Sequence, residues 1–160
     1  MTIKTERFAS MQDVHTIGMR FQISADFHAD IELVTGIDTD VWDLNGPHLE
    51  KITMEELQDS IVVTAKTHEA RIPIAVAETV RNTFPAEIKQ IAKHHKMLHR
   101  IFFITMPGEV YTTEKYISVY TGKDGKHPKD AAIELVRQNK EKGYQTIKEE
   151  QIARWESLWA

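Results

Sequence analysis

The sequence feature that most constrains the fold is an alternation of apolar and polar residues that runs from the N-terminus to about Gly122. A two-residue period places apolar side chains on one face of an extended strand. One clear example has these residues on a shared face: Ile17, Met19, Phe21 and Ile23. Turn-forming Gly and Pro residues separate the alternating segments. The pattern predicts an antiparallel β-sandwich, because strands of a parallel sheet are apolar on both faces.

The pattern changes from alternating to helical spacing after residue 122. Residues 127–143 have Pro128 near the expected start of a helix and Gly143 at its expected end. We therefore expect a β-sandwich over residues 1–122 and two linker helices over residues 123–160.

The second expected helix covers residues 146–159, and Thr146 with Glu149 fits a capping box at its start. Its apolar residues share one helical face. The face includes Ile152, Trp155 and Trp159. An apolar face with no partner in the sequence leads us to expect that the chain is a piece of a longer protein.

Composition excludes several classes of protein. A chain of 160 residues with 41% apolar residues can bury one core and is not a disordered segment. The formal net charge of −4 argues against nucleic acid as a partner, and no polybasic segment or long apolar run indicates a membrane. The sequence has no Cys, which excludes disulfides and favours a cytoplasmic location.

The polar stretch Gly36–Glu50 is the first candidate for a binding site. Its acids lack the spacing of an EF-hand, which would need an acid at position 42 followed by Gly. A flat Trp ring beside carboxylates suits a sugar, since the ring covers CH groups and the carboxylates accept from hydroxyls. The alternative is an ordinary loop whose Trp packs onto the sandwich. The candidate carbohydrate-binding residues are Asp40, Trp42, Asp43 and His48.

A cluster of histidines raises the possibility of a metal site. On a helix, His95 and His99 would lie four residues apart like two zinc ligands, but no third ligand is evident. In a strand they would be roughly 13 Å apart, at about 3.3 Å per residue. The segment Thr83–His99 could be a helix opened by Pro85 or a pair of strands. We predict strands, because its neighbours are strands, and no metal site.

Acid–base residues near the last expected strand do not define an active site. Glu109 and Glu114 could suggest a glycosidase, whose two carboxyls face each other across about 5–10 Å. Nothing in their spacing specifies such a pair, and Lys115 could simply oppose an acid on a neighbouring strand. We predict no catalytic residue and no cofactor in this chain.

Three stretches, taken in order, resemble glycoside hydrolase family 65, which includes maltose, trehalose, kojibiose and nigerose phosphorylases. They are residues 6–23 (ERFASMQDVHTIGMRFQI), 36–52 (GIDTDVWDLNGPHLEKI) and 111–124 (YTTEKYISVYTGKD), with the helical tail QIARWESLW. The Asn-Gly-Pro-His segment is more similar to the kojibiose and nigerose branch than to the maltose branch. No single motif is specific, and the resemblance rests on their order along nearly the whole chain.

The resemblance implies a galactose mutarotase-like super-β-sandwich, a helical linker, an (α/α)6 barrel and a small C-terminal sheet. This chain would be the later part of the sandwich plus the linker. The family's general acid and phosphate-binding residues lie in the barrel, so none is assigned here. The parent would carry out inverting phosphorolysis of an α-glucoside, with inorganic phosphate as co-substrate and β-glucose 1-phosphate as product.

The expected partners follow from the missing parts. The first expected partner is the absent barrel. The second is another copy of the chain, which would cover strand edges left unpaired. The third is a disaccharide, which could contact the polar loop. The alternatives are a free-standing sugar-binding sandwich, a hydrolase parent of the same family, and a scaffold or dimerisation module without a ligand.

Overall fold

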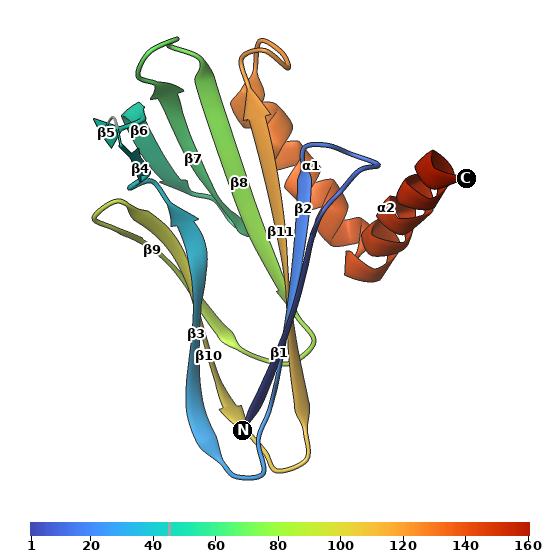
Figure 1. Cartoon of the computed structure of the whole chain (residues 1–160). Helices are drawn as coiled ribbons and strands as arrows, with labels where there is room; N and C mark the ends of the chain where they lie inside the picture. The colour runs from blue at the N-terminus through green and yellow to red at the C-terminus, as the bar shows by residue number, and fades with distance from the viewer. Residues whose placement is uncertain (45) are drawn as a thin grey trace.

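The computed structural model describes residues 1–44 and 46–160, apart from the side chain of Asp43, and places strands before helices (Figure 1). The strands are β1 (Thr2–Ala9), β2 (Thr16–Ser24), β3 (Ala29–Asp38), β4 (Trp42–Asp43), β5 (Gly46–Pro47), β6 (Leu49–Glu56), β7 (Ser60–Thr67), β8 (Pro73–Asn82), β9 (Glu87–Lys93), β10 (Lys96–Thr105) and β11 (Val110–Thr121), and the helices are α1 (Pro128–Lys142) and α2 (Tyr144–Trp159). The predicted fold, antiparallel sheets followed by two helices, is confirmed.

The strands form a large and a small antiparallel sheet and one short hairpin. The large sheet has six strands in the order β1-β2-β11-β8-β7-β6, and the small sheet has three in the order β3-β10-β9. The segment Thr83–His99 contributes β9 and the start of β10, joined by a turn at His94. Strands, as predicted for this segment, are therefore confirmed over a helix.

The two sheets pack face to face over only part of their area. β9 lies against β6, β10 against β7 and β3 against β8. The buried apolar side chains between the sheets include Ile23, Ile61, Val63, Val80, Met97 and Ile101. We call this region the closed part of the sandwich.

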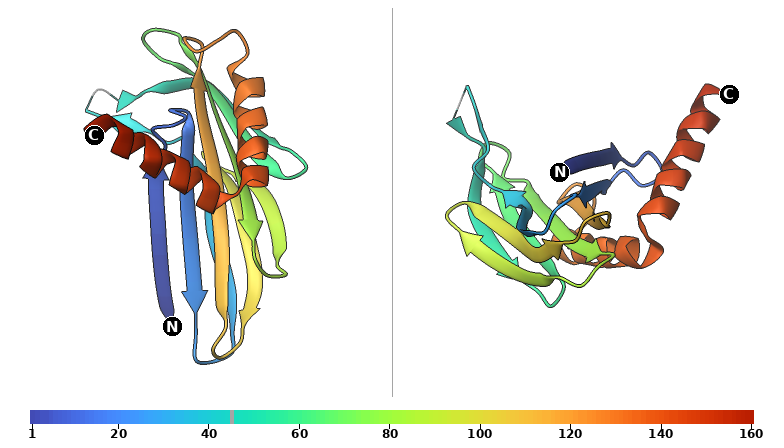
Figure 2. Two further views of the ribbon diagram at one scale, coloured as in Figure 1. Left: turned by 90° about the vertical axis from the view of Figure 1, so that its right-hand side faces the viewer. Right: turned by 90° about the horizontal axis from the view of Figure 1, so that it is seen from below.

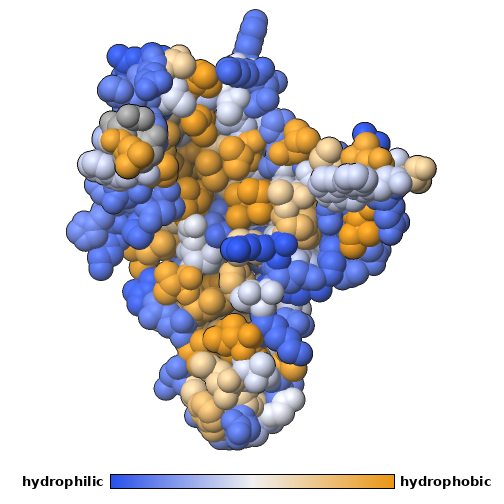
Figure 3. All heavy atoms as spheres, in the orientation of Figure 1, coloured by the Kyte–Doolittle hydropathy of each residue, from blue (hydrophilic) through white to orange (hydrophobic). Residues whose placement is uncertain are grey.

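The rest of the inner face of the large sheet is not fully covered. Apolar side chains of β2 and β11 on that face are only half-buried, and we call them the open face: Ile17, Met19, Phe21, Ile117 and Val119. Ile23, at the other end of β2, is buried in the core. Figure 3 shows apolar residues gathered in a hollow between the two sheets. The sandwich thus opens at the end of β2 that carries Ile17 and Met19 and is closed at the end that carries Ile23.

The first helix, α1, packs on the outer face of the large sheet (Figure 2). Ala132 and Val136 of α1 pack against Val62, Ala75 and Ala77 of the sheet. The Ser118 hydroxyl donates to the Ala132 carbonyl at 2.6 Å, and the Asn139 amide donates to the Thr16 hydroxyl at 2.8 Å. These contacts fix α1 lengthwise on the sheet.

α2 touches the sheet only at its start and then points away from the sandwich (Figure 1). Tyr144 and Ile147 are buried against Tyr116, whereas Trp155 and Trp159 are exposed. The predicted apolar face thus exists and is uncovered among the described residues.

The predicted capping box is wrong. α2 begins at Tyr144, so Thr146 lies inside its first turn. Gly143 caps the end of α1, as predicted. Its φ is 89°, and its N–H donates a hydrogen bond to the Asn139 carbonyl. This left-handed conformation, which glycine adopts without steric cost, lets the second helix start at the next residue.

Candidate functional site

The predicted sugar-binding loop is a small projecting hairpin formed by β4 and β5. It follows a turn in which the Asp40 N–H donates to the Asp38 carboxylate at 3.0 Å. The Trp42 indole N–H donates to the Asp40 carboxylate at 2.5 Å. Since Trp42 remains 65% exposed, this bond sets the direction of a ring that is available to solvent.

The hairpin also carries exposed apolar side chains. Val41, at its base, is 47% exposed, and Leu44, at its tip, is fully exposed. The side chain of Asp43 and residue Asn45 lie outside the described residues. Of the four predicted site residues, the structure therefore brings Asp40 and Trp42 together.

His48 lies at the base of the hairpin rather than at its tip. Its N–H donates to the Val41 carbonyl at 3.3 Å, and its carbonyl accepts from the His68 N–H at 2.8 Å. It is half-buried, and these bonds tie the hairpin to the turn that follows β7. The arrangement offers an indole face and a carboxylate on a convex surface, which suits a contact made at the edge of a larger cleft better than an enclosed reaction site.

A buried cluster lies between the two sheets, and in it Lys115 opposes an acid on a neighbouring strand, the interpretation that its sequence allowed. Glu78 is fully buried, with one carboxylate oxygen 3.2 Å from His99 Nδ1 and the other 2.8 Å from Lys115 Nζ. Lys115 also donates to the Thr35 hydroxyl at 2.8 Å. Glu78, His99 and Lys115 come from β8, β10 and β11, and Thr35 comes from β3, so the cluster joins the sheets at the border between the closed part and the open face.

A second cluster anchors the corner between the helices. Glu114 is 5% exposed and accepts from Tyr116 at 2.6 Å, from Arg81 Nε at 2.9 Å and from Arg20 at 3.1 Å. Burial alone would raise the pKa of Glu114, but these hydrogen bonds outweigh it and hold the pKa below its ordinary value. Arg20 also lies 4.1 Å from the ring centre of Tyr144, the first residue of α2. The cluster therefore determines where α2 leaves the sheet.

His95 and His99, the two histidines considered as metal ligands, make different contacts in the structure. His95 lies in the turn before β10, where its carbonyl accepts from the Thr39 N–H, whereas His99 is part of the buried cluster. Among the described residues, no group of three or more His, Asp or Glu side chains is arranged to hold a metal ion. Within the same residues, no helix is long and apolar enough to cross a membrane.

Residues 1–158 match the N-terminal domain of glycosyl hydrolase family 65. The chain belongs to this family. The family 65 chain is 31% identical to nigerose phosphorylase of Lachnoclostridium phytofermentans over 98% of its own length and 24% of that protein. It is 30% identical to 1,2-alpha-glucosylglycerol phosphorylase of Bacillus selenitireducens over 100% of its length and 21% of that protein.

A solved structure shares the fold of the family 65 chain. It is described as "Putative kojibiose phosphorylase from human microbiome", with a TM-score of 0.82, 14% identity, and coverage of 95% of this chain and 21% of that one. At this identity the likeness shows the fold alone. The chain spans about a quarter of the curated relatives or less, and the region it matches is the family's N-terminal domain.

Proposed function

We propose that this chain is a non-catalytic N-terminal domain of a disaccharide phosphorylase. The observation that carries the proposal is the match of residues 1–158 to the family's N-terminal domain, together with the two phosphorylases among its relatives. The Asp40–Trp42 pair beside the exposed hairpin supports an assisting role, since it offers an indole face and a carboxylate, the groups that contact a sugar.

In the parent reaction, a carboxylic acid protonates the glycosidic oxygen while inorganic phosphate attacks the anomeric carbon from the opposite face. The bond from that carbon to the leaving sugar breaks as the bond to phosphate forms, giving β-glucose 1-phosphate and a free sugar. The acid and the phosphate-binding groups belong to the barrel that lies outside residues 1–160. The chain itself contributes support and part of the cleft mouth.

The uncovered face of α2 supports the proposed barrel as a partner. Ile152 is 39%, Trp155 42%, Leu158 47% and Trp159 82% exposed, and the Trp155 and Trp159 rings lie 6.5 Å apart between centres. A contiguous exposed apolar face of this kind marks an interface. In the proposed parent, the barrel covers this face, and the Glu114 cluster sets the angle at which it does so.

An activity assay tests the proposed non-catalytic role. The purified chain is mixed with inorganic phosphate and either kojibiose or nigerose, and glucose 1-phosphate is measured. No product above the protein-free control is expected. Phosphate-dependent product formation by this chain would refute the proposal, whereas phosphate-independent release of glucose would favour the alternative of a hydrolase.

We further propose that the hairpin tip contacts the sugar, with Trp42 as its platform. Titration with kojibiose or nigerose should change the intrinsic fluorescence, and Trp42→Phe should abolish the change. Trp155→Phe is the matched control, because Trp155 is also exposed but lies on α2, and it should leave the response intact. A flat titration of the unsubstituted chain would remove the sugar contact and favour the alternative of a scaffold module.

A second copy of the chain is the proposed cover for the open face when no further polypeptide is present. Free strand edges and half-buried apolar residues favour such pairing. Light scattering should show a dimer or higher oligomer at micromolar concentration, and a monodisperse monomer would contradict this. The cytoplasmic location stays a prediction from the absence of Cys.

A further inference from the structure

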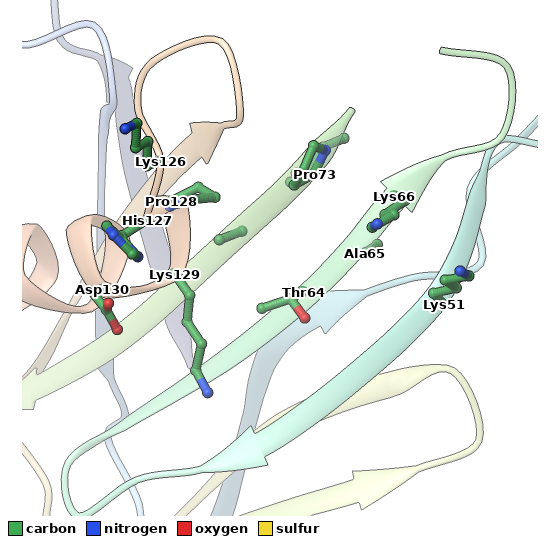
Figure 4. A pocket seen from close by; sticks show the side chains of 12 residues that line it. Lys51, Thr64, Ala65, Lys66, Pro73, Lys126, His127, Pro128, Lys129 and Asp130 are labelled. Carbon is green, nitrogen blue, oxygen red and sulfur yellow. The ribbon is translucent and has the colours of Figure 1, made fainter. Parts of the chain in front are cut away.

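A cavity with cationic walls lies on the outer face of the large sheet, away from the hairpin and from α2. It has a volume of about 360 Å³ and lies where β6, β7 and β8 pass the start of α1. A volume of this order is that of a small-molecule site. Lysines approach it from both sides, Lys51 and Lys66 from β6 and β7, and Lys126 and Lys129 from the segment that opens α1 (Figure 4).

The charges of this cavity are unbalanced. Lys129 is paired with Glu55 at 2.6 Å, and Asp130 is the acidic residue in the lining. Among the side chains that the structure describes, neither Lys51, Lys66 nor Lys126 forms an ion pair with a carboxylate. The chain as a whole carries a net charge of −4, so this concentration of unpaired cations runs against its average. Several ammonium groups around one cavity favour an anion that carries more than one charge.

The accessible apolar part of the cavity lining is suited to a carbon skeleton. It consists of Pro73 and Pro128 at one end, above the buried Ala75. Thr64 adds a hydroxyl, which bonds the Thr53 hydroxyl at 2.6 Å and keeps capacity for another hydrogen bond. An apolar lining with one hydroxyl and cationic walls matches a molecule with CH groups, hydroxyls and a phosphate.

We propose that this cavity binds the phosphate group of a small sugar phosphate. A phosphate monoester carries nearly two negative charges at neutral pH and accepts charge-assisted hydrogen bonds from lysine. The inference that the ligand carries a phosphate depends on the lysines alone. The inference that it also carries a sugar depends in addition on the proposed function, because a phosphorylase produces a sugar phosphate. The site is distinct from the hairpin tip, so the chain has two separate surfaces for sugar chemistry.

The test is a titration of the complete chain followed by amide NMR spectra, with glucose 1-phosphate, inorganic phosphate and glucose as separate ligands. Glucose 1-phosphate should shift the amides of residues 64–66, 126, 127, 129 and 130 saturably, and inorganic phosphate should shift the same amides with weaker affinity. Glucose should leave them unchanged. Inorganic phosphate binding as tightly as glucose 1-phosphate would identify the free ion as the ligand and overturn the sugar phosphate. No saturable shift of these amides would overturn the site itself.

Charge-reversal variants give the matched control. Lys51→Glu and Lys126→Glu alter exposed residues on opposite walls, and each should weaken binding of glucose 1-phosphate by roughly tenfold or more, as expected when one charge-assisted bond is lost. Lys93→Glu makes the same change of net charge on an exposed residue of β9, outside the cavity, and should have little effect. Equal weakening by all three variants would indicate general electrostatic attraction and overturn the proposal. The readout does not depend on catalysis, so a failed activity assay and a failed titration remain distinguishable.

Discussion

The closed part of the sandwich lies between the two sheets, whereas the open face of the six-stranded sheet has no second sheet over it. Ile101 is fully buried in the closed part, whereas Ile17, an identical side chain on the open face, is half-buried. Burial of apolar area is the dominant favourable term in folding. The difference indicates that the closed part supplies the stability of this domain, while the open face is a surface that further protein can cover.

The largest effect is expected at the border between the two regions. Glu78→Gln removes the carboxylate that faces Lys115 and His99 in a fully buried position. Breaking a buried ion pair leaves an uncompensated charge, so the free energy of unfolding should fall by about 3–5 kcal/mol in urea denaturation. Glu109→Gln alters an exposed acid and should change it by less than about 0.5 kcal/mol.

A double substitution sharpens this prediction. Replacing Glu78 by Leu together with Lys115 by Met removes both charges, and apolar replacement of a whole buried ion pair is often neutral or stabilising. The double variant should therefore recover part of the stability that Glu78→Gln loses. If Glu78→Gln is as stable as the unsubstituted chain, the cluster does not join the sheets as described.

The next effect compares the two isoleucines directly. Ile101→Ala should lower the free energy of unfolding by about 2–5 kcal/mol, because it removes buried methyl groups and leaves a cavity in the closed part. Ile17→Ala should cost less than half as much, because solvent or a neighbouring copy fills the space on the open face. Both values come from urea denaturation at low protein concentration. Equal losses would show that the open face contributes as much to the core as the closed part.

A smaller, pH-dependent effect is expected on the outer face. The pKa of Glu114 is held below its ordinary value by Tyr116, Arg81 and Arg20 despite its burial. A carboxylate with a lowered folded-state pKa stabilises the protein above the unfolded-state value near 4.5. That stabilisation is lost as the pH falls below this value toward the folded-state pKa.

Glu114→Gln should therefore lower the free energy of unfolding by about 1–3 kcal/mol at pH 7 and flatten its decline below pH 4.5. Urea denaturation at a series of pH values measures both. An unchanged acid slope in the variant would mean that other carboxylates account for the acid lability.

The regions also differ in how far the sequence predicted them. The two-residue period of Ile17 to Ile23 and the helical spacing after residue 122 fixed the fold class, because alternation and the 3.6-residue period are local properties. Asp40 and Trp42 are only two residues apart, so their proximity is also a local property. Their hydrogen bond was not predicted, and their contact with a sugar stays a prediction.

The charged groups brought together by the sheets could not be found in this way. Glu78, His99 and Lys115 lie on three strands whose adjacency depends on a non-consecutive strand order. The same holds for Lys51 and Lys126, which face one cavity from distant parts of the sequence. Strand order and the stacking of the two sheets are non-local, and a single sequence carries no pairing signal for them. The sequence could therefore suggest that Lys115 opposes an acid on a neighbouring strand, but it could not identify that acid as Glu78.

Amide hydrogen exchange tests most directly whether the half of the large sheet in the closed part is more stable than the half that carries the open face. β2 and β7 are matched for this purpose, because each has a hydrogen-bonded neighbour on both sides, but β7 lies in the closed part and β2 carries the open face. At low protein concentration, β7 amides should exchange only through global unfolding, and those around Ile17 and Met19 should exchange at least about tenfold faster through local opening. Equal protection of the two strands would contradict the division of the sheet into a stabilising half and an unfinished half.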